Sequence, residues 1–211
     1  MENKEVSKTL LKRLPLYLQY INSLPENIKN VSATKMAKAL GLGDVLVRKD
    51  LAKISGDDGM RKLGRAKEAL TRDITAFLDV KRTTCAVIVG AGKLGRALMD
   101  YEGFDNAGLH ILAGFDSNPV DPETDGGKPI YSVNRLESFC KSHEVAIGII
   151  AVPADNAQEV CNKLVACDIK GIWNFSPKHL IVPDDVIVQS EHLEFSLSAL
   201  RMQLKKQLTS E

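Results

Sequence analysis

The stretch "VIVGAGKLGRAL", residues 87–98, joins the end of an apolar segment to a glycine-rich turn. Gly90, Gly92 and Gly95 occupy the three glycine places of the pattern G-x-G-x-x-G. The first glycine permits a tight turn, the second lets a pyrophosphate approach the backbone, and the third lets a helix pack against the preceding strand. Amides at the start of that helix can bind phosphate oxygens. The predicted dinucleotide loop is Gly90, Ala91, Gly92, Lys93, Leu94 and Gly95.

The segments on either side of this loop favour the same fold. The run "TTCAVIVG" suits a strand in a buried parallel sheet. A second strand, "LHILAGFD", ends at Asp116, about 20 residues beyond the loop. A carboxylate there accepts hydrogen bonds from ribose hydroxyls and repels a 2′-phosphate, which favours NAD(H) over NADP(H). Asp116, with Ser117 beside it, is therefore a predicted cofactor contact, and a simple turn residue is the alternative.

Strand-like and helix-like segments continue to alternate as far as residue 190. Strands over "VAIGIIAV", "KGIWNF" and "DVIVQS" alternate with helices over "RLESFCKSH" and "DNAQEVCNKLVAC". This order predicts an α/β fold with a doubly wound parallel sheet of the Rossmann type. Ligands bind outside the carboxyl ends of such strands, so two more segments are expected to line the pocket, with ordinary turns as the alternative. Their residues are Val152, Pro153, Ala154, Asn174, Phe175, Ser176 and Pro177.

The charge of the 211-residue chain is unevenly distributed, and its length is sufficient for two modest domains. Residues 1–82 contain 17 of the 28 Lys and Arg and 10 of the 27 Asp and Glu, a balance of +7. The remaining residues have 11 and 17, a balance of −6. The basic first part predicts a polyanionic partner, and a solvated basic surface is the alternative.

Several classes of protein and of site are not indicated. No apolar run approaches the roughly 20 residues of a membrane span. The N-terminus has no signal-peptide core, so we expect a cytoplasmic protein without membrane contact. The 4 cysteines form no CxxC pair and the 4 histidines are scattered, so neither a disulfide framework nor a metal site is expected.

The N-terminal part has the pattern of a helix-turn-helix. Pro15 is expected in the first turn of a helix with an apolar face. Ser32 is the predicted N-cap of a second helix that ends near Leu40, and Gly41 suits the tight turn after it. A third helix is predicted over residues 44–55.

This third helix has two different faces. Val47, Leu51 and Ile54 recur at the spacing of a core-facing stripe. The opposite face carries the cations Arg48, Lys49 and Lys53. The combination is typical of a recognition helix in the DNA major groove, and any amphipathic surface helix is the alternative.

The segment "SGDDGMRKLGRAKEAL" follows the third helix. Its glycine and aspartate residues predict a turn, and Arg61 and Lys62 would extend from a short hairpin, or wing, to the phosphate backbone. A charged linker is the alternative. A protein partner instead of DNA also stays open for this half of the chain.

Six short motifs occur in an order and spacing that resemble one family over nearly the full length. They are "KRLPLY", "VRKDL", "VGAGKLGRAL", "YEGF", "AVPADNAQ" and "NFSP". The chain resembles the Rex family of redox-sensing transcriptional repressors. The resemblance implies a winged-helix DNA-binding domain (1–80), a Rossmann NAD(H) domain (81–190) and a C-terminal helix (191–211) exchanged between the protomers of a homodimer. It further implies a palindromic operator. NADH would release the protein from this operator, whereas NAD⁺ would permit the protein to bind it.

Matched positions extend the resemblance to single residues. It implies that Arg13, Arg48 and Lys49 contact DNA, that Lys62 is the wing cation and that Tyr101 lies near the nicotinamide. The predicted DNA-contact set is Lys12, Arg13, Tyr17, Ser32, Arg48, Lys49, Lys53, Arg61 and Lys62. No catalytic residue is expected.

The chain departs from the family pattern at several places. Gly43 and Leu46 stand where the family usually has Ser or Thr and Gln, and Gly64-Arg65 stands in place of Gly-Tyr. His192 occupies the place of an aspartate that takes part in the switch. Gly43 and Leu46 bear on which operator bases the protein contacts. Arg65 and His192 bear on the coupling between cofactor binding and DNA binding.

The C-terminal segment, from about Glu191 to Gln207, predicts an apolar helix. Leu193, Phe195, Leu197 and Leu200 suit a dimer interface, and packing on the protein's own sheet is the alternative. Two other functions also stay open. An NAD-dependent oxidoreductase would need a proton donor near Tyr101, but Asp105 stands where a catalytic lysine would be expected. A regulatory domain for CoA or another nucleotide could use the same glycine pattern.

Overall fold

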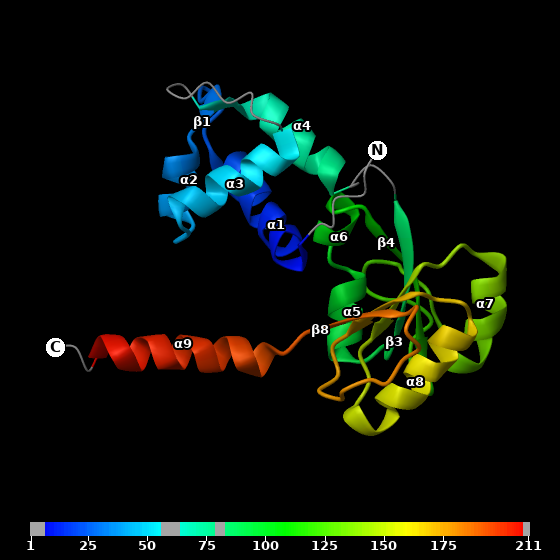
Figure 1. The fold of residues 1–211 in the computed structure, drawn as a ribbon. Helices are drawn as coiled ribbons and strands as arrows, with labels where there is room; N and C mark the ends of the chain where they lie inside the picture. The colour runs from blue at the N-terminus through cyan, green and yellow to red at the C-terminus, as the bar shows by residue number, and fades with distance from the viewer. Residues whose placement is uncertain (1–6, 56–63, 79–82, 209–211) are drawn as a thin grey trace. The chain divides into compact units, whose positions relative to one another are not determined.

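The chain divides into two compact units, Met1–Arg82 and Thr83–Glu211, in a computed structural model that describes residues 7–55, 64–78 and 83–208 (Figure 1). Arg61 and Lys62, the predicted wing cations, lie outside the described residues. Each unit contains its own cluster of buried apolar side chains, as independent domains do.

The N-terminal unit packs its helices around one core. Each helix contributes a fully buried side chain to this core: Leu14, Met36, Leu51 and Leu70. The elements described here are α1 (Lys8–Ser23), β1 (Asn30–Val31), α2 (Ala33–Ala39), α3 (Asp44–Ser55), β2 (Arg65–Ala66) and α4 (Lys67–Phe77).

Helix α1 differs from the prediction. It begins at Lys8, so Pro15 lies inside the helix and not in its first turn. The reason is the apolar stripe of Leu10, Leu14, Tyr17 and Ile21, all at most 2% exposed, which continues through the proline. Burial of this stripe outweighs the backbone hydrogen bond that a proline cannot donate.

A small two-stranded sheet belongs to this unit, and residues 56–63 of the predicted wing lie outside the described residues. Strand β2 pairs antiparallel with β1, which precedes α2, with Val31 opposite Arg65. Gly64 has a φ of +81°, and a Cβ atom there would lie 2.5 Å from the Val31 carbonyl oxygen. The close approach of these two strands therefore requires glycine at position 64.

The C-terminal unit is a doubly wound parallel sheet, as predicted. Its strand order is β5-β4-β3-β6-β7-β8, and every neighbouring pair is parallel. The order reverses between β3 and β6, where such folds bind their ligands. The elements are β3 (Thr84–Val89), α5 (Lys93–Met99), α6 (Gly103–Asn106), β4 (Leu109–Asp116), β5 (Ile130–Ser132), the 3₁₀ helix η1 (Val133–Arg135), α7 (Leu136–Ser142), β6 (Ile147–Ile150), α8 (Ala154–Ala166), β7 (Gly171–Asn174), β8 (Ile187–Ser190) and α9 (Leu193–Leu208).

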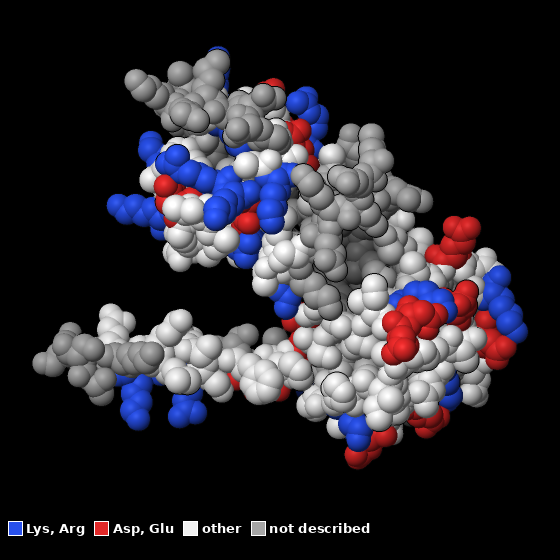
Figure 2. Space-filling view, in the orientation of Figure 1, with Lys and Arg blue, Asp and Glu red and all other residues white. Residues whose placement is uncertain are grey.

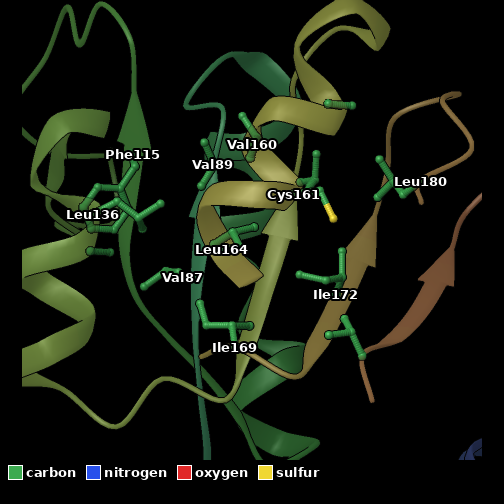
Figure 3. Packing of buried hydrophobic residues seen from close by; sticks show 14 residues of the cluster. Val87, Val89, Phe115, Leu136, Val160, Cys161, Leu164, Ile169, Ile172 and Leu180 are labelled. Carbon is green, nitrogen blue, oxygen red and sulfur yellow. The ribbon is translucent and has the colours of Figure 1, made fainter. Parts of the chain in front are cut away.

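Helices cover both faces of this sheet. On one face, Val87 and Val89 of β3 pack with Phe115, Leu136 and Leu164, so α7 and α8 lie over it (Figure 3). On the other face, Ala86 and Ile88 alternate with those valines and pack with Met99 of α5. Central strand β3 is thus apolar on both sides, which explains its continuous hydrophobic run.

Helix α9 leaves many apolar side chains exposed. They are Phe195, Leu197, Leu200, Met202, Leu204 and Leu208, each more than half exposed. Leu197, Leu200, Leu204 and Leu208 recur on one side of the helix, and an exposed apolar stripe of this kind marks an interaction site. None of the helices in the described part of the chain has the length and apolar character that crossing a membrane requires.

Candidate functional site

The glycine loop after β3 has the geometry that a dinucleotide needs. Gly90 has a φ of +103°, and a Cβ atom there would lie 2.5 Å from the Ala151 carbonyl oxygen. A Cβ atom on Gly95 would lie 1.8 Å from the Gly90 carbonyl oxygen, so α5 packs directly on the loop. A Cβ atom on Gly92 would meet nothing within 4 Å. The middle glycine therefore borders open space, which is where a pyrophosphate would approach the backbone.

Asp116 connects this loop to the neighbouring strand. It ends β4, and its Oδ2 atom accepts a hydrogen bond from the Ala91 amide at 2.8 Å. Its Oδ1 atom accepts one from the Asn118 amide at 3.0 Å. Each carboxylate oxygen has a second acceptor site, so the group can still bind a ribose diol. The neighbouring Ser117 is exposed.

Arg96, which the sequence reasoning missed, holds the loop from the other side. Its Nε atom donates to the Ala91 carbonyl oxygen at 3.0 Å, and its Nη1 atom donates to the Glu123 carbonyl oxygen at 3.2 Å. Its Nη2 atom lies 3.0 Å from the Asp121 carboxylate. Its position directly after the third glycine, in the helix that follows the loop, could have indicated this contact from the sequence.

A row of aromatic rings runs from α6, which precedes the amino end of β4, to Phe175, which follows the carboxyl end of β7. Tyr101, which is 58% exposed, contacts Phe104 at 4.9 Å between ring centroids, and Phe104 contacts Trp173 at 5.3 Å. Trp173 in turn contacts Phe175 at 4.8 Å. Phe104 and Trp173 were not predicted, because their relation to Tyr101 depends on how α6 and β7 pack. Phe175 is the ring of this row that lies next to the carboxyl end of a strand.

The side chains of two predicted pocket residues form hydrogen bonds within the protein. Asn174 and Ser176 are buried. The Asn174 Oδ1 atom accepts from the Ser176 amide at 2.9 Å, and its Nδ2 atom donates to the Lys178 carbonyl oxygen at 2.9 Å. Their side chains hold the loop after β7, so they are not free to bind a ligand. Pro153 and Pro177 are exposed, and Val152 and Ala154 are half-buried.

The helix-turn-helix has the local structure that the sequence predicts. The Ser32 hydroxyl accepts from the Lys35 amide at 3.4 Å and caps α2. Gly41 has a φ of +65°, which suits glycine in the turn before α3. Helix α3 buries Val47 and Leu51.

The opposite face of α3 carries the predicted cations. Arg48, Lys49 and Lys53 are exposed, as is Lys12 of α1. Figure 2 shows Lys and Arg side chains gathered on the visible face of this unit. The exposed cations can contact phosphates and base edges.

Tyr17 and Arg13 are placed differently from the expected direct contacts. Tyr17 is fully buried, and its hydroxyl donates to the Asp50 carboxylate at 2.7 Å. Arg13 donates to the same carboxylate at 2.6 and 2.9 Å, and its side chain is 18% exposed. Tyr17 is therefore a core residue that cannot reach DNA directly. The buried Asp50, which was not predicted as functional, connects α1 to α3.

The environment of this carboxylate sets its protonation state. Burial by itself raises the pKa of Asp50, but the hydrogen bonds from Arg13 and Tyr17 outweigh it and keep the pKa below its usual value. Burial, together with the hydrogen bond to Asp50, raises the pKa of Tyr17 to about 12. Asp50 is therefore ionised and Tyr17 neutral near pH 7.

Both parts of the chain match known families. Residues 5–52 match the family described as "Putative DNA-binding protein N-terminus", and residues 81–178 match "CoA binding domain". Two curated proteins named redox-sensing transcriptional repressor Rex, from Clostridium botulinum and Clostridium perfringens, are each 38% identical to this chain. The first match covers 98% of this chain and 99% of the relative, and the second covers 95% of each. The chain belongs to the Rex family.

Solved structures of the Rex-family repressor RSP are similar over the same length. The structure of RSP alone has a TM-score of 0.85 at 32% identity and covers 98% of this chain and 97% of that one. RSP in complex with NADH has a TM-score of 0.87 at 32% identity, with 98% of both chains covered. RSP with NAD⁺ and operator DNA has a TM-score of 0.85 at 33% identity, with 99% of both covered. These names describe regulation and not catalysis, so they do not favour the oxidoreductase alternative.

The residues that depart from the Rex pattern have defined surroundings. Leu46 is 39% exposed on α3. The His192 ring packs on Phe195 at 4.8 Å between centroids, and its Nδ1 atom lies 3.4 Å from the Glu194 carboxylate. Within the described residues, no group of His, Cys, Asp and Glu side chains has an arrangement that could hold a metal ion.

Proposed function

We propose that this Rex-family protein binds a palindromic operator as a homodimer and is released when NADH rises relative to NAD⁺. The observation that carries the proposal is full-length similarity to RSP in complex with NADH and in complex with NAD⁺ and operator DNA. The glycine loop and the cationic face of α3 supply the two kinds of site that such a repressor needs.

The cofactor site is proposed at the carboxyl ends of β3 and β4. The open space at Gly92 suits a pyrophosphate bound by the amides of Lys93 and Leu94. The Asp116 carboxylate suits the hydroxyls of an adenosine ribose and disfavours a 2′-phosphate, so NAD(H) is the proposed ligand and not NADP(H).

The aromatic row offers a physical basis for redox discrimination. The nicotinamide ring supplies the signal, because it is cationic in NAD⁺ and neutral in NADH. In this proposal Tyr101, Phe104 and Phe175 would border the nicotinamide, and their uncharged side chains would not form an ion pair with a cation. Burying the cationic ring against these side chains without an ion-pair partner costs several kcal/mol. Burying the neutral ring does not carry this cost. NADH would thus favour a closed, DNA-free form.

The DNA site is proposed on the N-terminal unit. Helix α3 would enter the major groove with Arg48, Lys49 and Lys53, while Lys12 would contact phosphates. Two protomers, joined through α9 and the Rossmann unit, would place two such helices on the two half-sites of a palindrome. A protein that binds the genome in this way is expected in the cytoplasm.

The test is a DNA-binding titration with both forms of the cofactor. Duplexes selected from a random pool should contain a palindrome, and fluorescence anisotropy should show that NADH weakens its binding and that NAD⁺ does not. Arg48→Ala should weaken binding at least about tenfold with either cofactor, whereas Lys141→Ala on α7 should not. Unchanged operator affinity at saturating NADH would contradict the proposal.

A further inference from the structure

Arg48, the central cation of α3, is held by residues from both helices of the helix-turn-helix. Its Nε atom donates to Asp44 Oδ2 at 2.9 Å, and its Nη2 atom donates to Thr34 Oγ1 at 3.0 Å. Asp44 is the first residue of α3, and Thr34 belongs to α2. The side chains of Arg48 and Asp44 are 59% and 40% exposed, so this group lies on the surface proposed to meet DNA.

These two hydrogen bonds leave one edge of the guanidinium available. An arginine has five N–H donors, and the edge formed by Nη1 and the second Nη2 hydrogen has no role in the contacts to Asp44 and Thr34. That edge has the fork geometry that binds guanine O6 and N7 together. An arginine that is already oriented loses less side-chain freedom when it binds a base.

The carboxylate of Asp44 would oppose DNA binding, because it adds a negative charge to the surface proposed to meet phosphates. The hydrogen bond from Arg48 lowers the pKa of Asp44, so its carboxylate remains charged near neutral pH. A negative charge in the first turn of a recognition helix repels DNA phosphates whatever the base sequence.

We propose that Asp44 and Thr34 are positioning residues that orient Arg48 to bind one guanine in each half-site, and that Asp44 thereby lowers general DNA affinity but raises sequence discrimination. This inference rests on the proposed function. An ordinary surface ion pair within a helix would instead stabilise α3 slightly and change the affinity for all DNA sequences alike.

The first experiment compares Asp44→Asn with the wild type on the selected palindrome and on a scrambled duplex of equal length, at one salt concentration. The variant should bind the scrambled duplex several-fold more tightly, because a repulsive charge is gone. The ratio of the two affinities should fall about tenfold, because Arg48 loses its orientation. Glu68→Gln on α4 is the matched control, since it removes one exposed carboxylate from the same unit and should preserve the ratio.

The second experiment identifies the base atom. Each guanine of the half-site is replaced in turn by 7-deazaguanine, which lacks the N7 acceptor. One replacement should weaken wild-type binding and have no further effect on Arg48→Ala. Asp44→Asn and Thr34→Val, whose folding is checked by thermal unfolding, should show a smaller penalty at that same guanine.

The outcomes separate the inference from the proposed function. If Asp44→Asn changes both affinities by one factor, or retains the full 7-deazaguanine penalty, the positioning role is wrong although the protein is still a repressor. If the wild type shows no preference for any palindrome, both the proposed function and this inference are wrong.

Discussion

Gly92 and Gly95 belong to one loop but have opposite surroundings, which separates binding from folding at the level of single residues. A methyl group on Gly95 would collide with the Gly90 carbonyl oxygen, whereas one on Gly92 would enter open space. We expect Gly95→Ala to lower the free energy of unfolding by about 2 kcal/mol and to abolish NADH binding.

Gly92→Ala is the matched variant, because its φ of −74° is accessible to alanine. It should keep the wild-type melting temperature but weaken NADH binding about tenfold or more, since the methyl group occupies the space proposed for the pyrophosphate. Thermal unfolding and calorimetric titration measure the two quantities. Equal NADH affinity in Gly92→Ala and the wild type would show that the cofactor does not approach this glycine.

At the scale of elements, the buried Asp50 joins the first helix to the recognition helix. Its pKa is lower in the folded protein than its ordinary value of 3.8, so between these two values the unfolded chain binds more protons. The stabilisation is therefore fully present above pH 3.8 and is lost as the pH falls through the folded pKa. Asp50→Asn should lower the free energy of unfolding at pH 7 by about 3 kcal/mol, because it leaves Arg13 partly buried without its partner.

Urea unfolding at neutral and acidic pH measures this contribution. The difference between wild type and Asp50→Asn should shrink as the pH falls, whereas the control Asp73→Asn, at a more exposed carboxylate 3.9 Å from Arg72, should differ little from wild type at any pH. A difference that stays constant with pH would mean that Asp50 stabilises the unit by packing and not by charge.

At the scale of the whole molecule, the exposed apolar residues of α9 predict that one chain is incomplete by itself. Leu197, Leu200, Leu204 and Leu208 recur at helical spacing on one side of α9. The double substitution Leu200→Glu and Leu204→Glu should produce a monomer at micromolar concentration in sedimentation experiments. Its operator affinity should fall about 100-fold, because two linked half-site contacts become independent.

Gln203→Glu places the same charge between these leucines on a different side of α9 and should leave the dimer intact. If the double variant sediments as a dimer, α9 is not the interface. If it is monomeric but binds the operator as tightly as wild type, dimerisation does not contribute to DNA binding.

The sequence alone was sufficient for features that depend on local patterns. The glycine loop, the strand ending at Asp116 and the two faces of α3 follow from spacing, because steric demands and periodic burial act over a few residues. The parallel sheet followed from the alternation of strands and helices. The short β5 and α6 gave too little periodicity to be predicted.

Only the tertiary structure decided which side chains meet across elements. It placed Tyr17 in the core and directed the Asn174 side chain into the loop after β7. It also brought Asp121 and the Glu123 carbonyl oxygen onto Arg96, and Thr34 onto Arg48. These contacts join residues whose partners are set by the packing of separate elements, so no spacing in the sequence encodes them. Local chemistry therefore determined where the two sites lie, and packing determined which side chains are free to act in them.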